Sequence, residues 1–482
     1  MRSRQLRASA RSRLAVASSA IILVIAVIFS LLHSSGPPPL PLPGLGRPAP
    51  PGDPFAYRPG RQADFQARAT AGEEYVLFVK SPGGVPATAA RVAAYRPLVD
   101  QAAKGTGIDP NLLEAIVFLE SAGYPDALAG PDASDAAGLT QILAQTGSSL
   151  LGMHIDLARS TRLTNEIANA YSLGETGLVA QLQRRRARID DRFDPAKALA
   201  ATVRYLEIAR RDLGREDLAV VSYHMGIGNL ESVLRDYDGG RPVPYAQLFF
   251  DTAPDRHAGA YALLQGFGDD SSLYYWRILA AESIMSLYRS DRSRLVQLSA
   301  LETAAGDDSN VLHPSSQTVV FATPDDLANA YAAREVLPLP SDPAKLGLAY
   351  SPALGSLAHR LGQRPALYHG LRPAALDLLI ELAARVRVLS RSKAPLIVAQ
   401  AVTDGSYEHL LGTPGGYSLP TTGYQFEIER TYASAAQAVA FQAMLDRLQA
   451  LNVIAWSREP TTIDVTVASD AGRVIVDGPF GP

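Results

Sequence analysis

The stretch Asp109-Pro-Asn-Leu-Leu-Glu-Ala-Ile-Val-Phe-Leu-Glu-Ser-Ala-Gly123 predicts a helix with a defined start and a defined end. Asp109 is a good N-cap residue, and Pro110 suits the first turn because a helix leaves that backbone N–H unpaired in any case. Gly123 is placed to end the helix. Between these limits the sequence is mostly apolar and contains two glutamates, Glu114 and Glu120.

Glu120 falls on the apolar face of this helix, whereas Glu114 points elsewhere and is expected to be solvated. A carboxyl group on an apolar face near a helix C-terminus has its charged form disfavoured by desolvation and by the helix dipole. Such a group stays protonated near neutral pH and can donate a proton. The alternative is a half-buried glutamate paired with an arginine. The apolar neighbours of Glu120, at about 100° per residue, are Leu113, Ile116 and Val117.

Two further motifs follow in the chain, Gly138-Leu-Thr-Gln-Ile after a loop rich in Gly, Asp and Ala, and Ser222-Tyr-His-Met-Gly-Ile-Gly after a long helical stretch. With Glu120-Ser, their order and spacing resemble the soluble lytic transglycosylases and the related goose-type lysozymes. The pattern of that family is Glu-Ser, Gly-Leu-Met-Gln and Ala-Tyr-Asn-Ala-Gly. The connecting segments Phe193-Asp-Pro-Ala-Lys-Ala-Leu and Tyr205-Leu also look like the family, and the similarity covers roughly residues 90–290.

The resemblance implies an α-helical, lysozyme-like domain whose cleft binds peptidoglycan glycan strands without a cofactor. Glu120 would be the general acid for the β-1,4 bond between N-acetylmuramic acid and N-acetylglucosamine. The resulting carboxylate would then act as base on the muramoyl 6-hydroxyl, which closes a 1,6-anhydro ring. Tyr223 matches the family tyrosine whose hydroxyl orients this acid.

The same resemblance implies a set of substrate-binding residues around the acid. Gln141 matches the polar cleft residue, and Ser121 supports the helix end behind Glu120. The sequence departs from the family at Thr140, which replaces Met, and at His224, which replaces Asn. His224 is either a titratable group beside the cleft or a hydrogen-bonded core histidine, and neither departure removes the acid. The expected substrate-binding residues are Ser121, Gly138, Leu139, Gln141 and His224.

Plain hydrolysis, as in goose-type lysozymes, would need a second carboxylate across the cleft. Aspartates on the loop between the first two motifs are the candidates, although surface loops also use Asp for turns. A later helix carries three adjacent aromatic residues that either belong to the core or line the cleft and stack on sugars. The aspartates are Asp126, Asp132 and Asp135, and the aromatic residues are Tyr274, Tyr275 and Trp276.

The N-terminal sequence predicts a membrane anchor. A basic tail (1–13) precedes an uncharged run from Leu14 to Leu32, and nineteen such residues just span a bilayer core of about 30 Å as a helix. The basic flank keeps the N-terminus inside and places the remainder outside. We expect an uncleaved signal anchor (14–33) in the cell membrane, followed by a Pro-rich linker (34–60). A cleaved signal peptide is the alternative.

Composition narrows the function further. The chain has 482 residues, 47% of them hydrophobic, which is enough for two domains. It contains no cysteine, which excludes a lipobox, disulfides and thiolate chemistry. The net charge of −3, with both signs interspersed, argues against a nucleic-acid partner. One basic cluster, Arg184-Arg-Arg with Arg188, is expected to be a solvated helix face, or else a contact with anionic wall polymer or lipid. It lies in a stretch, 147–192, that is expected to form a helical insertion bordering the cleft.

The second half of the chain predicts an α+β domain. Ala394–Val402 is typical of a buried strand, while Tyr424–Arg430 and Ile463–Val467 alternate as further strands. Leu371–Leu389 and Ala433–Leu451 have helical periodicity. The chain is therefore predicted to be multidomain, with a transmembrane helix, a mainly α lysozyme-like catalytic domain (61–295) and a C-terminal α+β domain (310–482).

This C-terminal domain resembles the zinc D-Ala-D-Ala carboxypeptidases in layout but lacks their zinc ligands. In the matching stretch, Ser418-Leu-Pro-Thr-Thr-Gly-Tyr-Gln-Phe-Glu, Pro420 stands at the His position and Glu427 at the Asp position. Asp464 stands at the late-strand His position, and Glu459 lies near the place of the catalytic Glu. Two carboxylates without imidazole make a poor zinc site. We therefore expect no metal, and a module that contacts stem peptides or the cell wall, or is purely structural.

Three classes of function remain open at this point. The first is a membrane-anchored lytic transglycosylase, with muramidase-type hydrolysis as its variant. The second is a metallopeptidase that works through the C-terminal domain. The third is a wall-binding scaffold in which the cleft holds glycan and Glu120 is idle.

Overall fold

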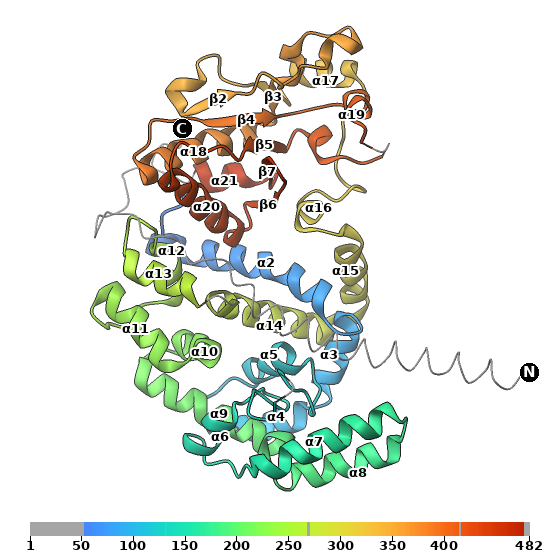
Figure 1. The fold of residues 1–482 in the computed structure, drawn as a ribbon, viewed down its shortest axis with the longest axis vertical. Helices are drawn as coiled ribbons and strands as arrows, with labels where there is room; N and C mark the ends of the chain where they lie inside the picture. Colours follow the sequence, from blue (N-terminus) through green and yellow to red (C-terminus); the bar gives the residue numbers. More distant parts are fainter. Residues whose placement is uncertain (1–52, 131, 268–269, 414–415, 477–482) are drawn as a thin grey trace, which may run out of the picture. The chain divides into compact units, whose positions relative to one another are not determined.

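The computed structural model describes residues 53–130, 132–267, 270–413 and 416–476. The basic tail, the predicted signal anchor and most of the predicted linker lie outside these residues, so the anchor stays a prediction. Within the described ranges, no helix is both long enough and apolar enough to cross a membrane. Figure 1 shows a largely helical chain whose strands all come from its C-terminal part.

The described residues form two compact units that alternate along the sequence. The helical unit comprises residues 76–245 and 264–300, and the sheet unit comprises residues 53–75, 246–263 and 301–476. The predicted domains, 61–295 and 310–482, were continuous stretches, whereas the sheet unit also takes residues 61–75 and 246–263 from the first of them. Unit boundaries fall inside α2 (Gln62–Lys80), α12 (Tyr245–Asp251), α13 (Ala258–Gly266) and α15 (Arg292–Ala305).

Helix α5 (Pro110–Ser121) is the predicted helix, and it lies at the centre of the helical unit. The Asp109 side chain accepts a hydrogen bond from the backbone N–H of Asn111, as expected of an N-cap. The helix ends one residue earlier than predicted, because Ala122 already adopts a left-handed conformation. Gly123 follows with φ 79°, and a Cβ there would lie 2.8 Å from the Cβ of Arg91. Close packing therefore requires glycine at this position.

Four other helices of this unit, α3, α4, α9 and α14, contact α5. Helix α5 packs against α14, α4 and α3, and α9 packs against α4 and α10. The helices are α3 (Val85–Ala93), α4 (Arg96–Ala103), α6 (Ala144–Ser149), α7 (Leu157–Ser172), α8 (Thr176–Ala187), α9 (Pro195–Leu213), α10 (Glu216–Met225), α11 (Ile227–Asp238) and α14 (Tyr274–Ser290), with short 3₁₀ turns η2 (Asp191–Phe193) and η3 (Asp270–Leu273).

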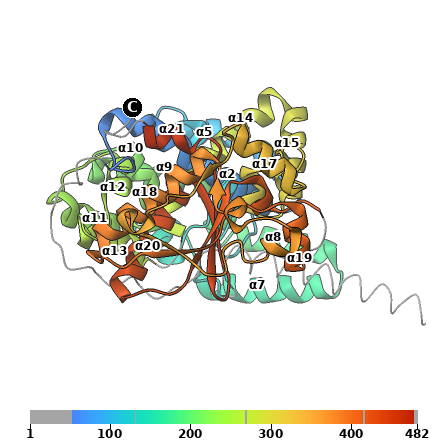
Figure 2. The same cartoon turned by 90° about the horizontal axis from the view of Figure 1, so that it is seen from above.

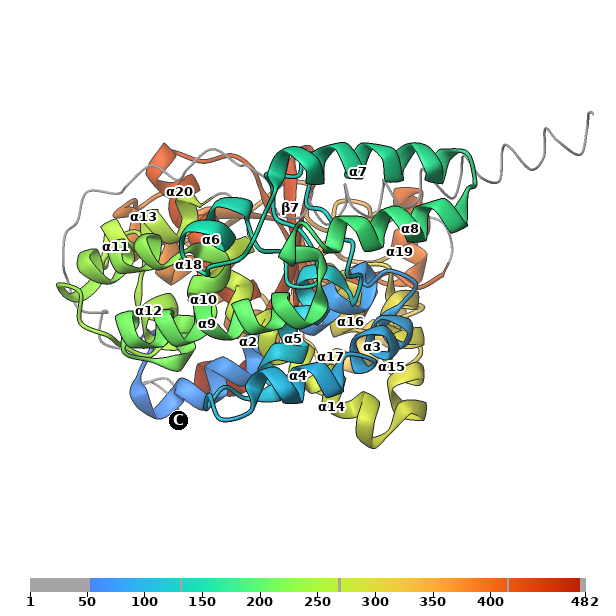
Figure 3. The ribbon, with the colours of Figure 1, turned by 90° about the horizontal axis from the view of Figure 1, so that it is seen from below.

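The predicted helical insertion is a hairpin of two antiparallel helices, α7 and α8, which run side by side in Figure 3. The hairpin has a small apolar cluster of its own, formed by Leu163, Ile167, Ala170, Val179 and Leu182. This cluster explains why so polar a segment is ordered as helix. Arg184, Arg185 and Arg188 are exposed, as expected for a solvated face.

The sheet unit is built on a five-stranded sheet with strand order β2-β4-β5-β7-β6. Strands β2 and β4 are parallel, and the other neighbours are antiparallel. The three predicted strands are confirmed as β4, β5 and β7, and the two predicted helices as α18 and α20. The strands are β1 (Leu337–Pro338), β2 (Leu348–Tyr350), β3 (Gly370–Leu371), β4 (Leu396–Gln400), β5 (Gln425–Glu429), β6 (Ile454–Arg458) and β7 (Thr462–Val467).

One face of this sheet is apolar and the other is polar, as alternation along each strand requires. Phe426 and Ile428 on β5, with Ile463 and Val465 on β7, are buried on the apolar face. Helices α18 and α20 pack together and contact β7 and β6, and both lie to one side of the strands in Figure 2. The helices of this unit are α16 (Asp308–Leu312), α17 (Pro324–Ala332), α18 (Pro373–Ser390), α19 (Gly405–Leu411), α20 (Ala435–Ala450) and α21 (Ala471–Val476), with the 3₁₀ turn η7 (Leu419–Thr422).

Candidate active site

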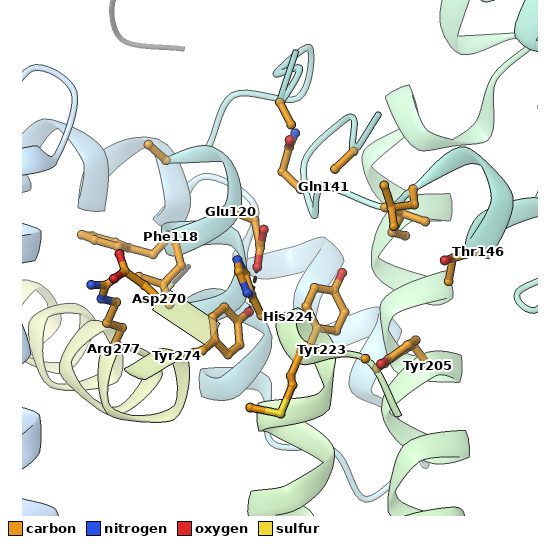
Figure 4. Close-up of a pocket in the computed structure, with 18 of the residues that line it drawn as sticks. Phe118, Glu120, Gln141, Thr146, Tyr205, Tyr223, His224, Asp270, Tyr274 and Arg277 are labelled. Atoms are coloured by element: carbon orange, nitrogen blue, oxygen red, sulfur yellow. Dashed lines mark hydrogen bonds and ion pairs between the residues drawn. The ribbon is translucent and has the colours of Figure 1, made fainter. Parts of the chain in front are cut away.

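A cavity of about 650 Å³ in the helical unit, hereafter the Glu120 cavity, collects most of the chemically active residues. Its walls come from the C-terminal end of α5, the loop that follows it, the junction of α10 and α11, and the start of α14. Figure 4 shows the side chains that meet around the acid. Among the lining residues are Glu120, Gln141, Tyr223, His224 and Tyr274.

Glu120 lies half-buried in this cavity with a neutral hydrogen-bond donor beside it. The phenolic hydroxyl of Tyr274 donates to Oε1 of Glu120 over 2.8 Å. Burial raises the pKa of the Glu120 carboxyl from 4.5 to about 7, and the hydrogen bond from Tyr274 opposes that rise. Both protonation states are therefore populated near neutral pH, which suits a group that donates a proton and later accepts one.

Tyr274, the first residue of α14, was predicted only as one of three aromatic residues that belong to the core or line the cleft, and its hydrogen bond to Glu120 was not predicted. Its ring stacks on the ring of His224 at 5.2 Å between centroids and lies nearly parallel to that of Tyr223 at 6.5 Å. Burial raises its pKa well above 10, so the phenol is neutral and remains a donor. Of the three adjacent aromatic residues, Tyr274 lines the cavity, whereas Trp276 is fully buried in the core and Tyr275 is not among the lining residues.

Tyr223 contacts the loop rather than the acid. Its hydroxyl donates to the carbonyl oxygen of Thr140 over 2.7 Å and lies 3.2 Å from the hydroxyl of Thr202. The prediction that this tyrosine orients Glu120 directly therefore needs correction, because the hydroxyl bonded to the acid belongs to Tyr274. The ring of Tyr223 still lines the cavity.

The loop of the second motif is held in place by close packing and backbone hydrogen bonds. Gly138 has φ 82°, and a Cβ there would lie 1.8 Å from the carbonyl oxygen of Arg192, so only glycine fits. The Ser121 hydroxyl donates to the carbonyl oxygen of Leu139 over 2.7 Å, which ties the loop to the end of α5. The spacing between the first two motifs thus sets the distance from Glu120 to the loop.

Three of the five predicted substrate-binding residues lie behind the cavity wall. Ser121 and Leu139 are essentially inaccessible, Gly138 is packed against backbone, and none of the three is among the lining residues. Their predicted contact with substrate needs correction to a positioning role. Gln141 and His224 do line the cavity.

Gln141 lines the cavity, whereas its neighbour Thr140 is buried behind the wall. Gln141 has φ 49°, and its side-chain amide nitrogen donates to the carbonyl oxygens of Gly138 and Ala127 over 2.8 and 3.1 Å. Thr140 is fully buried, and its hydroxyl has no hydrogen-bond partner among the described residues. The replacement of Met by Thr at this position therefore acts behind the wall and not on the sugar.

The sequence left two alternatives for His224, a group beside the cleft or a hydrogen-bonded core histidine, and the structure shows features of both. It lines the cavity, yet its Nδ1 lies 2.7 Å from the hydroxyl of Ser271 on η3, and its ring stacks on Tyr274. These contacts hold the His224 ring against the ring of Tyr274. His224 is thus a hydrogen-bonded residue of the wall.

The predicted second carboxylates are elsewhere. Asp126 pairs with the buried Arg186 over 2.8 Å. The Asp270 carboxylate does line the cavity, but it pairs with Nη1 of Arg277 over 2.7 Å. The three predicted candidates, Asp126, Asp132 and Asp135, are not among the residues that line the cavity.

Two charged side chains expected in solvent are buried instead. Glu114 is only 1% exposed, and it accepts hydrogen bonds from Arg96 over 2.9 Å and Arg289 over 2.5 Å. Arg186, also 1% exposed, lies over the ring of Phe193 at 3.6 Å from its centroid. In both cases tertiary partners replace water, which the local sequence pattern does not reveal.

In the sheet unit, Pro420, Glu427 and Asp464 stand at the positions that were compared with zinc ligands. Glu427 on β5 stands directly opposite Asp464 on β7. Pro420 lies in η7 and offers no donor atom. In the part of the chain that the structure describes, no group of three His, Cys, Asp or Glu residues is arranged to hold a metal ion.

Comparison with known proteins supports the reading of the helical unit. Residues 97–241 match the family model described as Transglycosylase SLT domain. The matched segment contains Glu120, the Gly138 loop and Tyr223, and it ends before Tyr274. A search of curated proteins returns no match for the chain.

Proposed function

We propose that this protein is a membrane-anchored peptidoglycan lytic transglycosylase. It cleaves the β-1,4 bond between N-acetylmuramic acid and N-acetylglucosamine and releases a 1,6-anhydromuramoyl product. The observation that carries this proposal is the pairing of Glu120 with Tyr274 in a large cavity, within a unit that matches the Transglycosylase SLT domain.

The first half of the proposed reaction uses the protonated form of Glu120. Its proton passes to the glycosidic oxygen as the bond from the muramoyl C1 to that oxygen breaks, and N-acetylglucosamine leaves as an alcohol. The substrate acetamido group shields the positive charge that develops at C1. The negative charge left on Glu120 is stabilised by the Tyr274 hydroxyl, because a hydrogen bond to a charged acceptor is stronger than one to a neutral acceptor.

In the second half, the Glu120 carboxylate removes the proton from the muramoyl 6-hydroxyl, and that oxygen attacks C1. The ring closes, Glu120 regains its proton, and no water is consumed. A pKa of about 7 places the same group close to balance between its acid and base roles.

The surroundings of Glu120 favour this route over hydrolysis. Hydrolysis with inversion needs a second carboxylate that activates water on the opposite face of the sugar. Besides Glu120, the carboxylate that lines the cavity in the described residues is Asp270, and it forms an ion pair with Arg277 over 2.7 Å. Ring closure by the substrate's own hydroxyl requires no such group.

Residues 14–33 form the membrane anchor in this proposal, and the domains that follow work on the outer side of the cell membrane. The C-terminal domain contacts the cell wall and has no peptidase activity, because Pro420 replaces the histidine that zinc would need. Fractionation of cells that express the full chain, with and without residues 1–33, tests the anchor. Recovery of the full chain in the soluble fraction would contradict it.

The activity is tested with purified sacculi and mass spectrometry of the released fragments. Wild-type protein should release anhydromuropeptides, and Glu120→Gln should lower their rate of release by about 10³-fold, as expected for loss of a general acid. The matched control is Glu166→Gln, the same chemical change at an exposed position on α7.

Three outcomes would contradict the proposal. Full product formation by Glu120→Gln would remove the acid from the mechanism. Fragments with reducing muramoyl ends would show hydrolysis instead of ring closure. Binding of wild-type protein to sacculi without any released fragment would identify a scaffold.

A further inference from the structure

The α7–α8 hairpin ends in a turn, residues 171–178, whose residues are all exposed. This turn, hereafter the hairpin tip, carries three large apolar residues. Tyr171, Leu173 and Leu178 are 50%, 72% and 41% exposed, and among the described residues no large apolar side chain is more exposed than that of Leu173. Figure 1 and Figure 3 both show the tip pointing away from α6 and α9, which belong to the same unit.

The exposure of these side chains is not required by the packing of the hairpin itself. The apolar cluster between α7 and α8 contains none of the three. The turn has a defined conformation, because a hydrogen bond from the backbone N–H of Glu175 to the carbonyl oxygen of Ala170 closes it over 2.9 Å. An ordered turn that exposes several apolar side chains together is typical of a surface that contacts another molecule or a membrane.

Helix α8 continues from the tip with a basic outer face. Arg185 follows Leu178 by seven residues, or about two turns, so the two side chains lie on the same face of the helix. Arg184 and Arg188 flank this face, and all three arginines are exposed. None of the three forms an ion pair with another described residue, whereas Arg186 on the buried face of α8 does. The outer face of α8 therefore carries positive charge that the described residues do not neutralise.

The hairpin is basic within a chain that is slightly acidic. Residues 157–188 contain six arginines and two glutamates, whereas the net charge of the whole chain is −3. One of the glutamates, Glu175, lies in the tip, and the other, Glu166, is exposed on α7. The excess of arginine makes the hairpin complementary in charge to an anionic surface.

The order of apolar and basic side chains along the hairpin selects the kind of surface. A rise of 1.5 Å per residue places Arg185 about 10 Å along α8 from Leu178. A bilayer of anionic lipid has negative headgroups outside and an apolar layer beneath them. A tip of leucine and tyrosine can enter its interface while the arginines behind the tip reach the phosphates. A wall polymer offers the negative charge but no apolar layer, so it would leave the tip side chains in water.

We propose that the hairpin tip docks on a membrane of anionic lipid. The three apolar residues of the tip enter the interface between headgroups and acyl chains, and the arginines on the outer face of α8 pair with headgroup phosphates. This contact is separate from the activity proposed for Glu120. The anchor proposed for residues 14–33 brings the hairpin within reach of a bilayer, and the experiment distinguishes the two contacts.

The test uses the full chain with one fluorescent label on the hairpin tip. The chain contains no cysteine, so Ser172→Cys gives a single site for an environment-sensitive nitrobenzoxadiazole dye. The labelled protein is mixed with vesicles of phosphatidylcholine, alone or with phosphatidylglycerol, and the vesicles are collected by flotation. On the anionic vesicles the dye emission should shift to shorter wavelength, because the dye leaves water for the interface. The matched control is Asn165→Cys, an exposed position on the same face of α7 but about two turns from Ser172, whose dye should keep its emission.

The outcomes separate docking of the tip from insertion of the anchor. A chain that floats with the vesicles but shows no emission shift at Ser172→Cys would overturn the docking and keep the anchor. A chain that does not float at all would contradict both. An equal shift caused by lipid-free sacculi would assign the tip to the cell wall and overturn the choice of lipid.

The apolar part of the contact is tested by the double variant Leu173→Ser, Leu178→Ser. The ratio of docked to free tip, taken from the dye emission, should fall roughly tenfold or more, because burial of apolar side chains drives insertion. Both side chains are exposed, so the fold should be kept. Val296→Ser, the corresponding change at an exposed position on α15, is the matched control. An unchanged ratio in the double variant would overturn the proposal.

The charged part is tested by changing Arg184, Arg185 and Arg188 together to Gln. On the anionic vesicles the ratio should again fall roughly tenfold or more, because each basic residue near an anionic surface adds to binding. On phosphatidylcholine alone the variant and its labelled parent should behave alike. Added salt should weaken docking of the parent on the anionic vesicles. Docking that neither this variant nor salt weakens would overturn the assignment to anionic lipid.

Discussion

The two ends of helix α5 hold their glutamates in opposite ways. Near the start of the helix, Glu114 is almost fully buried and accepts from two arginines, Arg96 and Arg289. At the end of the helix, Glu120 is half-buried and accepts from a neutral phenol, Tyr274. The same residue type on one helix is thus paired with two arginines at one position and with a phenol at the other.

Helix α14 supplies a different hydrogen-bond partner to each glutamate, because it packs antiparallel to α5 and contacts both ends of that helix. Its first residue, Tyr274, reaches Glu120, and Arg289, near its last turn, reaches Glu114. A cation stabilises a carboxylate, whereas a phenol leaves the effect of burial only partly opposed. The lesson is that the chemistry of a carboxyl group is set by what the neighbouring helix presents to it.

The largest expected effect in this comparison is on stability. Glu114→Gln should lower the free energy of unfolding by about 2 kcal/mol, because it removes hydrogen bonds between charged groups from a buried position. Urea denaturation at pH 8 measures the change. Glu166→Gln on α7 should change nothing measurable, and an equally stable Glu114→Gln protein would show that the two arginines do not need this partner.

Glu120→Gln should raise the free energy of unfolding in the same urea denaturation at pH 8. The pKa of Glu120 in the fold, about 7, is above its ordinary value of 4.5, so its contribution to stability is complete below pH 4.5 and is lost as pH rises through 7. At pH 8 the glutamine variant should therefore be more stable than wild type, by on the order of 2 kcal/mol. The difference should disappear near pH 4, and destabilisation at pH 8 would contradict it.

Tyr274→Phe should change both the maximal rate and the pH–rate profile, because it removes the hydrogen bond to Glu120. Loss of the donor to Glu120 should lower the maximal rate about tenfold, the equivalent of about 1.4 kcal/mol. It should also raise the pKa of Glu120, since this hydrogen bond opposes the effect of burial. The acid must be protonated to act, so the alkaline limb of the pH–rate profile should move to higher pH. Tyr275→Phe is the control, and a limb that moved down or stayed would contradict the assignment.

The smallest effect is expected for Tyr223→Phe. This change removes the hydrogen bond to Thr140, worth about 1 kcal/mol, while Ser121 still holds the loop through Leu139. The rate should fall only a few-fold, and the alkaline limb should stay in place because Tyr223 does not donate to Glu120. A shift of that limb equal to the shift in Tyr274→Phe would show that both tyrosines act on the acid directly.

Local signals in the sequence were sufficient for the secondary structure around the site. The N-cap and proline at the start of α5 and the alternation in β5 act over a few residues, and both elements were predicted. Glu120, Gln141 and Tyr223, which the motifs predicted as site residues, line the Glu120 cavity, and their roles in a reaction stay predictions.

The sequence by itself determined that α5 starts after Asp109 and that β4, β5 and β7 are strands, because caps and periodicity are properties of neighbouring residues. Only the tertiary structure decided that Tyr274 reaches Glu120, that Glu114 and Arg186 are buried, and that the two units share the chain in alternating segments. Tyr274 and Glu120 are 154 residues apart, and their contact depends on how α14 packs on α5. The direction of a side chain across a helix interface depends on the whole of that packing, so no local pattern in the sequence reports it.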